Sequence, residues 1–198
     1  MPDASSITQM HDETTLAWHG SSEEKNTEPQ DLSSLIRAQH RANFDLWHEE
    51  DKARDPAATD HDIAQVKRNI DRLNQRRNDL VEQIDIALLA SLQEALDRHP
   101  DSPLHSETAG MMIDRLSILA LKIFHTDEEA HRATATEAHR QRNHDRLALL
   151  REQRTDLANA LYTLLQDAAA GRRRFKLYRQ MKMYNDPDLN PLIYGKKA

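Results

Sequence analysis

Cysteine is absent from this 198-residue chain, and glycine and aromatic residues are scarce. Without a thiol, the chain has no means of forming a disulfide, a thiolate metal site or a cysteine nucleophile. Only four glycines and seven prolines are present, which favours long helices over many short strands. Aromatic residues make up 5% and charged residues 30% of the sequence, so we expect an aliphatic core beneath a heavily charged surface.

The sequence also lacks a long apolar run, a secretory leader and an excess of positive charge. No segment approaches the roughly 18 apolar residues of a membrane span. The first twenty residues have no positive region followed by an apolar core. We therefore expect a cytoplasmic protein with no membrane span. The formal net charge of −6 argues against nucleic acid as a partner.

Composition divides the chain into a polar tail and one helical domain. Residues 1–30 are rich in Ser, Thr, Glu and Gln and predict a mobile tail. Residues 31–198 predict a single domain. Hydrophobic periodicity, capping residues and prolines predict four helices, at 31–54, 60–98, 104–125 and 145–170. Residues 127–144 are expected to form an exposed helix or the rim of a helical hairpin.

The third helix, LHSETAGMMIDRLSILALKIFH, is apolar on most sides and is expected to lie at the centre of the fold. Its polar residues Asp114, Arg115 and Lys122 would then face neighbouring helices. Ser106 or Thr108 is the expected N-cap, and the amide groups of that helix end would also suit an anion. The predicted fold class is all-α: long antiparallel helices around a central apolar helix. Gly171 would end the fourth helix, and a basic and aromatic cap with a short helix would follow.

The first helix changes from apolar to polar along one face. Leu32 and Ile36 begin a stripe that continues at a helical spacing through Gln39, His40, Asn43, Trp47, Glu50, Asp51 and Arg54. Unpaired polar groups are costly to bury. The face therefore forms a structural polar network, turns toward solvent, or lines a ligand pocket.

Two arginines occupy matching positions on apolar seams. Arg77 and Arg154 each follow a leucine by four residues and precede an aspartate by two. A seam arginine needs a carboxylate, a phosphate or a route to water. They are either ion-paired, with Asp85 and Glu50 as candidate partners, or they form a clamp for an anion.

Other chemical motifs are incomplete. Glu128-x-x-His131 has metal-ligand spacing and three more histidines lie nearby, but no second such motif completes a di-metal site. Glu82-x-x-Asp85 resembles part of the acidic motifs of all-helical nucleotide pyrophosphohydrolases, whose first acidic motif is incomplete here. No glycine-rich phosphate loop or nucleophile elbow is present. We therefore assign no metal and no cofactor.

Three segments in order carry a family resemblance: LIRAQHRANFDLWHEEDKARDP, LHSETAGMMIDRLSILALKIFH and KLYRQMKMYNDPDLNP. Together they resemble the bacterial domain-of-unknown-function family 4254 over about residues 32–194. The resemblance implies an all-helical cytoplasmic protein encoded near glycosyltransferases of surface-polysaccharide synthesis. It implies no established reaction and no catalytic residues.

The sequence thus favours an enzyme or binding protein for a phosphorylated, sugar- or nucleotide-linked anionic metabolite. The candidate acid–base residues are His40, Glu50, Asp51 and His105. The candidate substrate-binding residues are Asn43, Trp47, Arg54, Arg77, Asp114, Arg115, Lys122 and Arg154. The alternative is a noncatalytic interaction or scaffold protein of glycan synthesis, with its inward polar groups in closed salt bridges. Homo-oligomer formation stays open.

Overall fold

The computed structural model describes residues 3–20, 28–179, 188–191 and 195. They form five helices, α1 (Ala4–His19), α2 (Leu32–Lys52), α3 (Asp60–Arg98), α4 (Ala109–His131) and α5 (Glu137–Ala169), and no named strand. The predicted all-α class is confirmed. None of the described helices is both long and apolar enough to span a bilayer.

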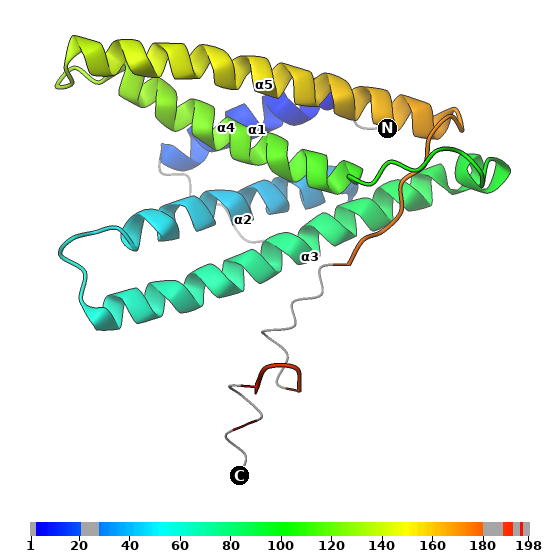
Figure 1. Ribbon diagram of the computed structural model, residues 1–198, viewed down its shortest axis with the longest axis horizontal. Helices are drawn as coiled ribbons and strands as arrows, with labels where there is room; N and C mark the ends of the chain where they lie inside the picture. The colour runs from blue at the N-terminus through cyan, green and yellow to red at the C-terminus, as the bar shows by residue number, and fades with distance from the viewer. Residues whose placement is uncertain (1–2, 21–27, 180–187, 192–194, 196–198) are drawn as a thin grey trace.

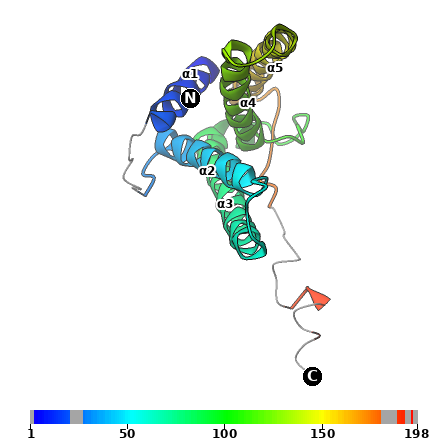
Figure 2. The same ribbon diagram turned by 90° about the vertical axis from the view of Figure 1, so that its left-hand side faces the viewer.

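Two antiparallel helical hairpins make up most of the fold. The pair α2–α3 lies against the pair α4–α5, and α1 lies alongside α2 and α4 (Figures 1 and 2). Helix α4 contacts each of the other four helices. Its apolar residues Ile113, Leu116 and Leu121 are buried, which confirms the predicted central helix.

The helix ends follow from their capping residues. Thr108 Oγ1 accepts a hydrogen bond from Met111 N, so it is the N-cap of α4. Gly171 has φ +70° and ends α5, as expected for a glycine in the left-handed region. Helix α4 continues six residues beyond the predicted end, and α5 begins eight residues before the predicted start. Residues 127–144 therefore form the rim of the α4–α5 hairpin.

The predicted mobile tail is wrong for residues 4–19, which form α1. This helix buries Ile7, His11, Thr15 and Trp18, at spacings of four, four and three residues. The stripe is helical, but histidine and threonine occupy its centre. The search for apolar periodicity therefore missed this face, because polar side chains make up part of it.

The expected short C-terminal helix is wrong for residues 172–179, which are extended. Arg174 N donates to Pro103 O at 3.0 Å, and His105 N donates to Arg174 O at 2.7 Å. The segment therefore pairs with the loop before α4. Its own residue Phe175 is buried in the core. Residues 180–187 of the expected cap lie outside the described residues.

Candidate functional site

The polar face of α2 points into the bundle and meets α4. His40 and Asn43 are buried. Asn43 Nδ2 donates to Asp114 Oδ1 and to Ser117 Oγ, both at 2.9 Å, and Gln39 Nε2 donates to Asp114 Oδ1 at 2.6 Å. The inward orientation predicted from the stripe is confirmed for Gln39, His40 and Asn43, because these bonds join α2 to the central helix. The end of the stripe turns outward, since Asp51 and Arg54 are exposed.

His40 lies in a closed hydrogen-bond network. Its Nε2 lies 3.1 Å from the carbonyl oxygen of His11, which only accepts, so Nε2 carries the proton. Nδ1 then accepts from Ser117 Oγ, 2.7 Å away. Burial lowers the pKa of His40 to about 3. The structure therefore places this candidate acid–base residue among structural contacts, under α1.

Arg77 and Asp114 face each other without a hydrogen bond. Arg77 Nε lies 3.8 Å from Asp114 Oδ1 and has no hydrogen-bond partner, although the atom is buried. Burial raises the pKa of Asp114, while the charge of Arg77 and the bond from Asn43 oppose that rise. The amides of Gln39 and Asn43 already hold the carboxylate, which leaves a donor of Arg77 free.

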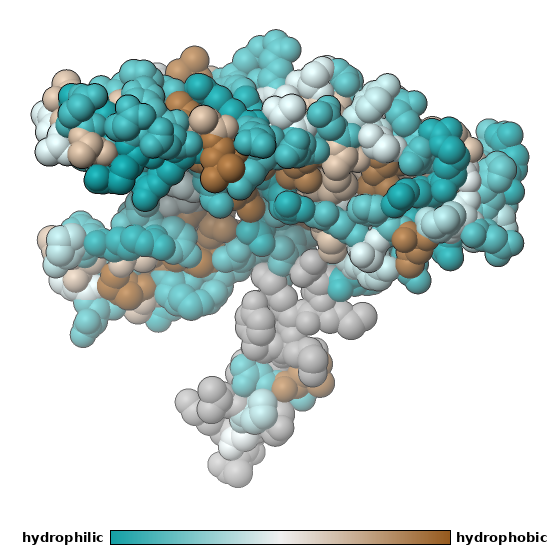
Figure 3. All heavy atoms as spheres, turned by 45° about the horizontal axis from the view of Figure 1, so that its top comes forward, coloured by the Kyte–Doolittle hydropathy of each residue, from teal (hydrophilic) through white to brown (hydrophobic). Residues whose placement is uncertain are grey.

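A cavity of about 330 Å³ opens between α2, α3 and α4. Figure 3 shows hydrophobic atoms in the hollow between the two hairpins. Six predicted site residues line the cavity together with three apolar ones: Asn43, Trp47, Glu50, Asp51, Arg54 and Arg77, with Leu46, Ile118 and Leu121.

The cavity offers a flat wall and charges of both signs. The indole of Trp47 stacks on His125 with ring centres 4.8 Å apart and an interplanar angle of 10°, which fixes the wall. Arg54 is paired with Glu50 at 3.2 Å. Arg77 is thus the cavity arginine with a buried unsatisfied donor. Such a site suits a ligand with a planar part and an anionic group.

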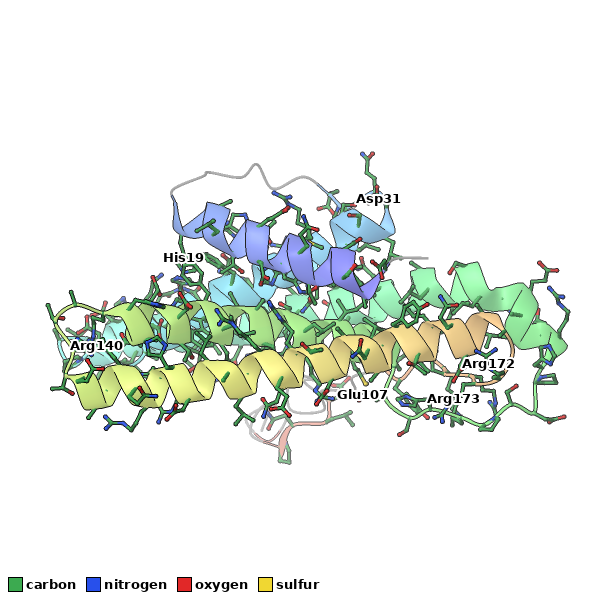
Figure 4. All side chains as sticks on the ribbon, turned by 90° about the horizontal axis from the view of Figure 1, so that it is seen from above. His19, Asp31, Glu107, Arg140, Arg172 and Arg173 are labelled. Atoms are coloured by element: carbon green, nitrogen blue, oxygen red, sulfur yellow. The ribbon has the colours of Figure 1, made fainter. Side chains whose placement is uncertain are left out.

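Three other candidates lie in a separate groove between α4 and α5. His105, Arg115 and Lys122 line this groove of about 740 Å³, together with Gln153 and Asp156. Arg115 is paired with Glu107 at 2.6 Å. In Figure 4, Glu107 lies on the opposite side of α5 from His19. The predicted residues therefore do not form one site: six line the cavity beside α2 and three line this groove.

Arg77 and Arg154 do not share a cavity, so the predicted clamp is wrong. Arg154 Nη1 donates to both carboxylate oxygens of Asp12 on α1, at 2.7 and 2.8 Å. Arg154 also lines a different cavity, of about 390 Å³, beside the start of α1. Asp12 belongs to the segment that was predicted to be a mobile tail. The sequence analysis therefore could not identify it as the partner of Arg154.

The N-terminus of α4 is occupied by Asp85, which also corrects the suggested Asp85–Arg77 pair. Gly110 N donates to Asp85 Oδ1 at 2.7 Å, and the Thr108 hydroxyl donates to Oδ2. Burial raises the pKa of Asp85, and these two donors oppose the rise. The carboxylate from α3 thus fills the anion position at this helix end.

The metal-spaced residues of the α4–α5 rim are spread over separate contacts. His131 Nδ1 donates to Asp127 O at 2.8 Å, whereas His139 bonds Glu129 at 2.7 Å. Among the described residues, the group with three ligand atoms close together is instead His19, His48 and His125. Sequence reasoning missed His19 and His48, because they lie far apart in the chain and one belongs to α1.

Fold and site define an all-helical protein with a ligand-sized cavity between two helical hairpins. The family model described as "Protein of unknown function (DUF4254)" matches residues 33–177, and the chain belongs to this family. The match begins after α1 and ends within the C-terminal extended segment. Comparisons with curated proteins and with solved structures find no match.

Proposed function

We propose that the cavity between α2, α3 and α4 binds a small anionic metabolite with a planar or sugar-like body and a phosphate or carboxylate group. The observation that carries the proposal is Arg77, which lines the cavity and whose buried Nε has no hydrogen-bond partner. A buried unsatisfied donor costs about 1–3 kcal/mol. An anionic ligand beside this guanidinium would pair with its charge and offer it an acceptor.

Size and wall chemistry support a small molecule. The cavity volume of about 330 Å³ lies at the small end of the usual range for ligand sites. Leu46, Ile118 and Leu121 give it an apolar floor, and Trp47 gives a face for stacking. Asn43 is also at the wall, and its Nδ2 is already bonded to Asp114 and Ser117, so only its carbonyl oxygen is left to accept from a ligand hydroxyl.

Glu50 and Asp51 are the acid–base candidates that the cavity retains. Both line it, whereas His40 is enclosed and His105 lies in the other groove. An enzyme of this family would therefore use carboxylates and not His40 to move protons in this cavity. A role in surface-polysaccharide synthesis would make a nucleotide sugar or sugar phosphate the ligand class to test first.

Thermal shift and calorimetry with nucleotide sugars, sugar phosphates and nucleotides would test the proposal. We expect saturable binding by the parent chain and a loss of at least tenfold in affinity for Arg77→Met. Arg77→Lys keeps the positive charge but loses the bidentate guanidinium group, so it should weaken binding less than Arg77→Met. Arg154→Met is the matched control, because it removes an equivalent arginine outside the cavity.

The scaffold alternative makes a different forecast. Such a protein would show no saturable response to any of these anions, or the same response in the parent and in Arg77→Met. Either result would contradict the proposed site. Equal weakening by Arg77→Met and Arg154→Met would also contradict it, because the effect would then follow bulk charge.

A further inference from the structure

Three histidines from three helices meet next to Trp47. His19 ends α1, His48 lies on α2 and His125 on α4. One ring nitrogen of each lies within 4.8 Å of a ring nitrogen of both others. The ring centres are 5.1 Å apart for His19–His125, 5.2 Å for His19–His48 and 6.0 Å for His48–His125. Figure 4 shows His19 reaching from the end of α1 toward the helices beneath it.

Each of the three rings uses Nδ1 to donate a hydrogen bond. His19 Nδ1 donates to Thr15 O and His48 Nδ1 to Phe44 O, both at 2.8 Å. His125 Nδ1 donates to Glu128 Oε2 at 2.9 Å. Carbonyl and carboxylate oxygens only accept, so the proton of each neutral ring is on Nδ1. The lone pair of each ring is therefore on Nε2.

Two of the three Nε2 atoms are buried and have no hydrogen-bond partner among the described residues. His19 Nε2 and His125 Nε2 are both buried and without a hydrogen bond. The lone pairs of these two buried nitrogens are therefore available to bind a metal ion.

We propose that His19, His48 and His125 bind one divalent transition-metal ion through Nε2, with Zn²⁺ as the best match. A tetrahedral zinc site with Zn–N bonds of about 2.0–2.1 Å sets its nitrogens about 3.3 Å apart. The three nitrogens would close by at most about 1.5 Å to reach that spacing. Ring centres in such a site are about 5.2 Å apart. The His19–His48 and His19–His125 separations already match this value.

The surroundings match those of a histidine metal site. Metal-bound histidines usually donate their other N–H to a carbonyl or a carboxylate, which fixes the ring. Here Thr15, Phe44 and Glu128 supply these acceptors. Phe124 stacks on His19 with ring centres 4.2 Å apart, and Trp47 stacks on His125. Three nitrogen donors favour zinc-like ions over Mg²⁺ or Ca²⁺, which prefer oxygen.

The ion would connect α1 to the rest of the bundle. Its ligands come from α1, α2 and α4, and three protein ligands leave a fourth coordination position open, as in catalytic zinc sites. The site does not depend on the proposed anion cavity, since Arg77 is not one of its ligands. Arg77→Met should therefore bind the metal as the parent does.

The test uses the full chain without a histidine tag, stripped by chelator and titrated with Zn²⁺, Co²⁺ and Mg²⁺. We expect one Zn²⁺ per chain, a higher Tm, and slower hydrogen exchange in α1. Bound Co²⁺ should show the strong visible absorption of a four-coordinate ion. Mg²⁺ should change none of these. His19→Gln, His48→Gln and His125→Gln should each weaken Zn²⁺ binding at least tenfold.

His131→Gln is the matched control. His131 lies on α4 like His125 and, like His19 and His48, donates Nδ1 to a carbonyl four residues earlier, but its side chain is 64% exposed and outside the cluster. It should bind Zn²⁺ like the parent. The proposal fails if the parent binds no ion saturably, if Co²⁺ shows only weak six-coordinate absorption, or if the His131 variant loses the ion while the cluster variants keep it. The parent spectrum decides the question even where a cluster variant does not fold.

Discussion

Two buried histidines make the interior sensitive to acid. The rings of His11 and His40 lie 4.4 Å apart, and neither residue is exposed. Burial lowers the pKa of both, that of His40 to about 3. Both titrate near 6.5 in the unfolded chain. Below about pH 6.5 the unfolded chain therefore binds more protons, and the free energy of unfolding falls as the pH falls toward the folded pKa values.

We expect His11→Leu to reduce this loss of stability in acid. His11 has no hydrogen bond at either ring nitrogen, so an apolar residue leaves no side-chain partner behind. From pH 6 to pH 5, the parent should lose about 1 kcal/mol more than the variant, near the limit of 1.4 kcal/mol per pH unit for one histidine.

Urea unfolding of both chains at pH 7.5, 6 and 5 measures this difference. Asp85 and Asp114 act in the opposite sense, because their raised pKa values favour proton uptake by the folded state. They are present in both chains and cancel in the comparison. Parallel pH profiles would show that His11 is protonated in the folded protein.

At Gly110, α4 lies close against α3. A Cβ at this position would lie 2.7 Å from Val81 O and 2.8 Å from Asp85 Oδ1. Gly110→Ala should therefore lower the free energy of unfolding by about 1–3 kcal/mol, despite the better helix propensity of alanine. Ala120→Gly, on the same helix, would report the loss of propensity and packing without this clash. A Gly110→Ala variant as stable as the parent would contradict the close packing.

At the level of the helices, the packing of α1 is expected to contribute to stability. Trp18 and Ile7 are buried against the bundle. We expect Trp18→Ala to destabilise the protein by about 3–5 kcal/mol and Ile7→Ala by about 2–5 kcal/mol. Leu16→Ala is the matched control, because that side chain is 66% exposed and should change stability by less than about 0.5 kcal/mol. Denaturant midpoints measure the stability of all three variants. Equal midpoints for the three would show that α1 does not pack on the bundle.

Most of the helices could be predicted from the sequence, because their ends are set by local residues. Helix α3 begins and ends where periodicity and the prolines predicted, and Thr108 and Gly171 act as expected. The inward polar face of α2 was also visible, since 100° per residue places Ile36, His40 and Asn43 on one side.

Partners across the fold were not predictable in the same way. Two contacts depend on where α1 docks: the carboxylate of Asp12 that neutralises Arg154, and the approach of His19 to His48 and His125. Sequence spacing gives the face of a residue on its own helix but not the helix opposite. For that reason the cavity residues of α2 were found together, while Arg154 was assigned to the wrong site.

Across the whole molecule, protection from exchange should be uneven. Helix α4 touches all other helices, whereas the first turns of α3, from Asp60 to Arg72, are mostly exposed. Hydrogen exchange should therefore be slowest in the middle of α4 and markedly faster between residues 60 and 72. Mass spectrometry of peptides from both regions would measure this, and equal protection would indicate that the chain opens only as one unit.

Helix α1 precedes the other four helices in the sequence, and this affects the order of folding during synthesis. It leaves the ribosome before them, yet two of the helices that cover it, α4 and α5, begin only at Ala109 and Glu137. The hairpin of α2 and α3 can pair as soon as both helices have emerged, because its contacts are local. The contacts of α1 with α4 and α5 therefore form only after most of the chain has been made. The histidine and threonine on its buried face leave fewer apolar side chains exposed until then, so the polar character that conceals this face also suits a helix whose packing is completed late.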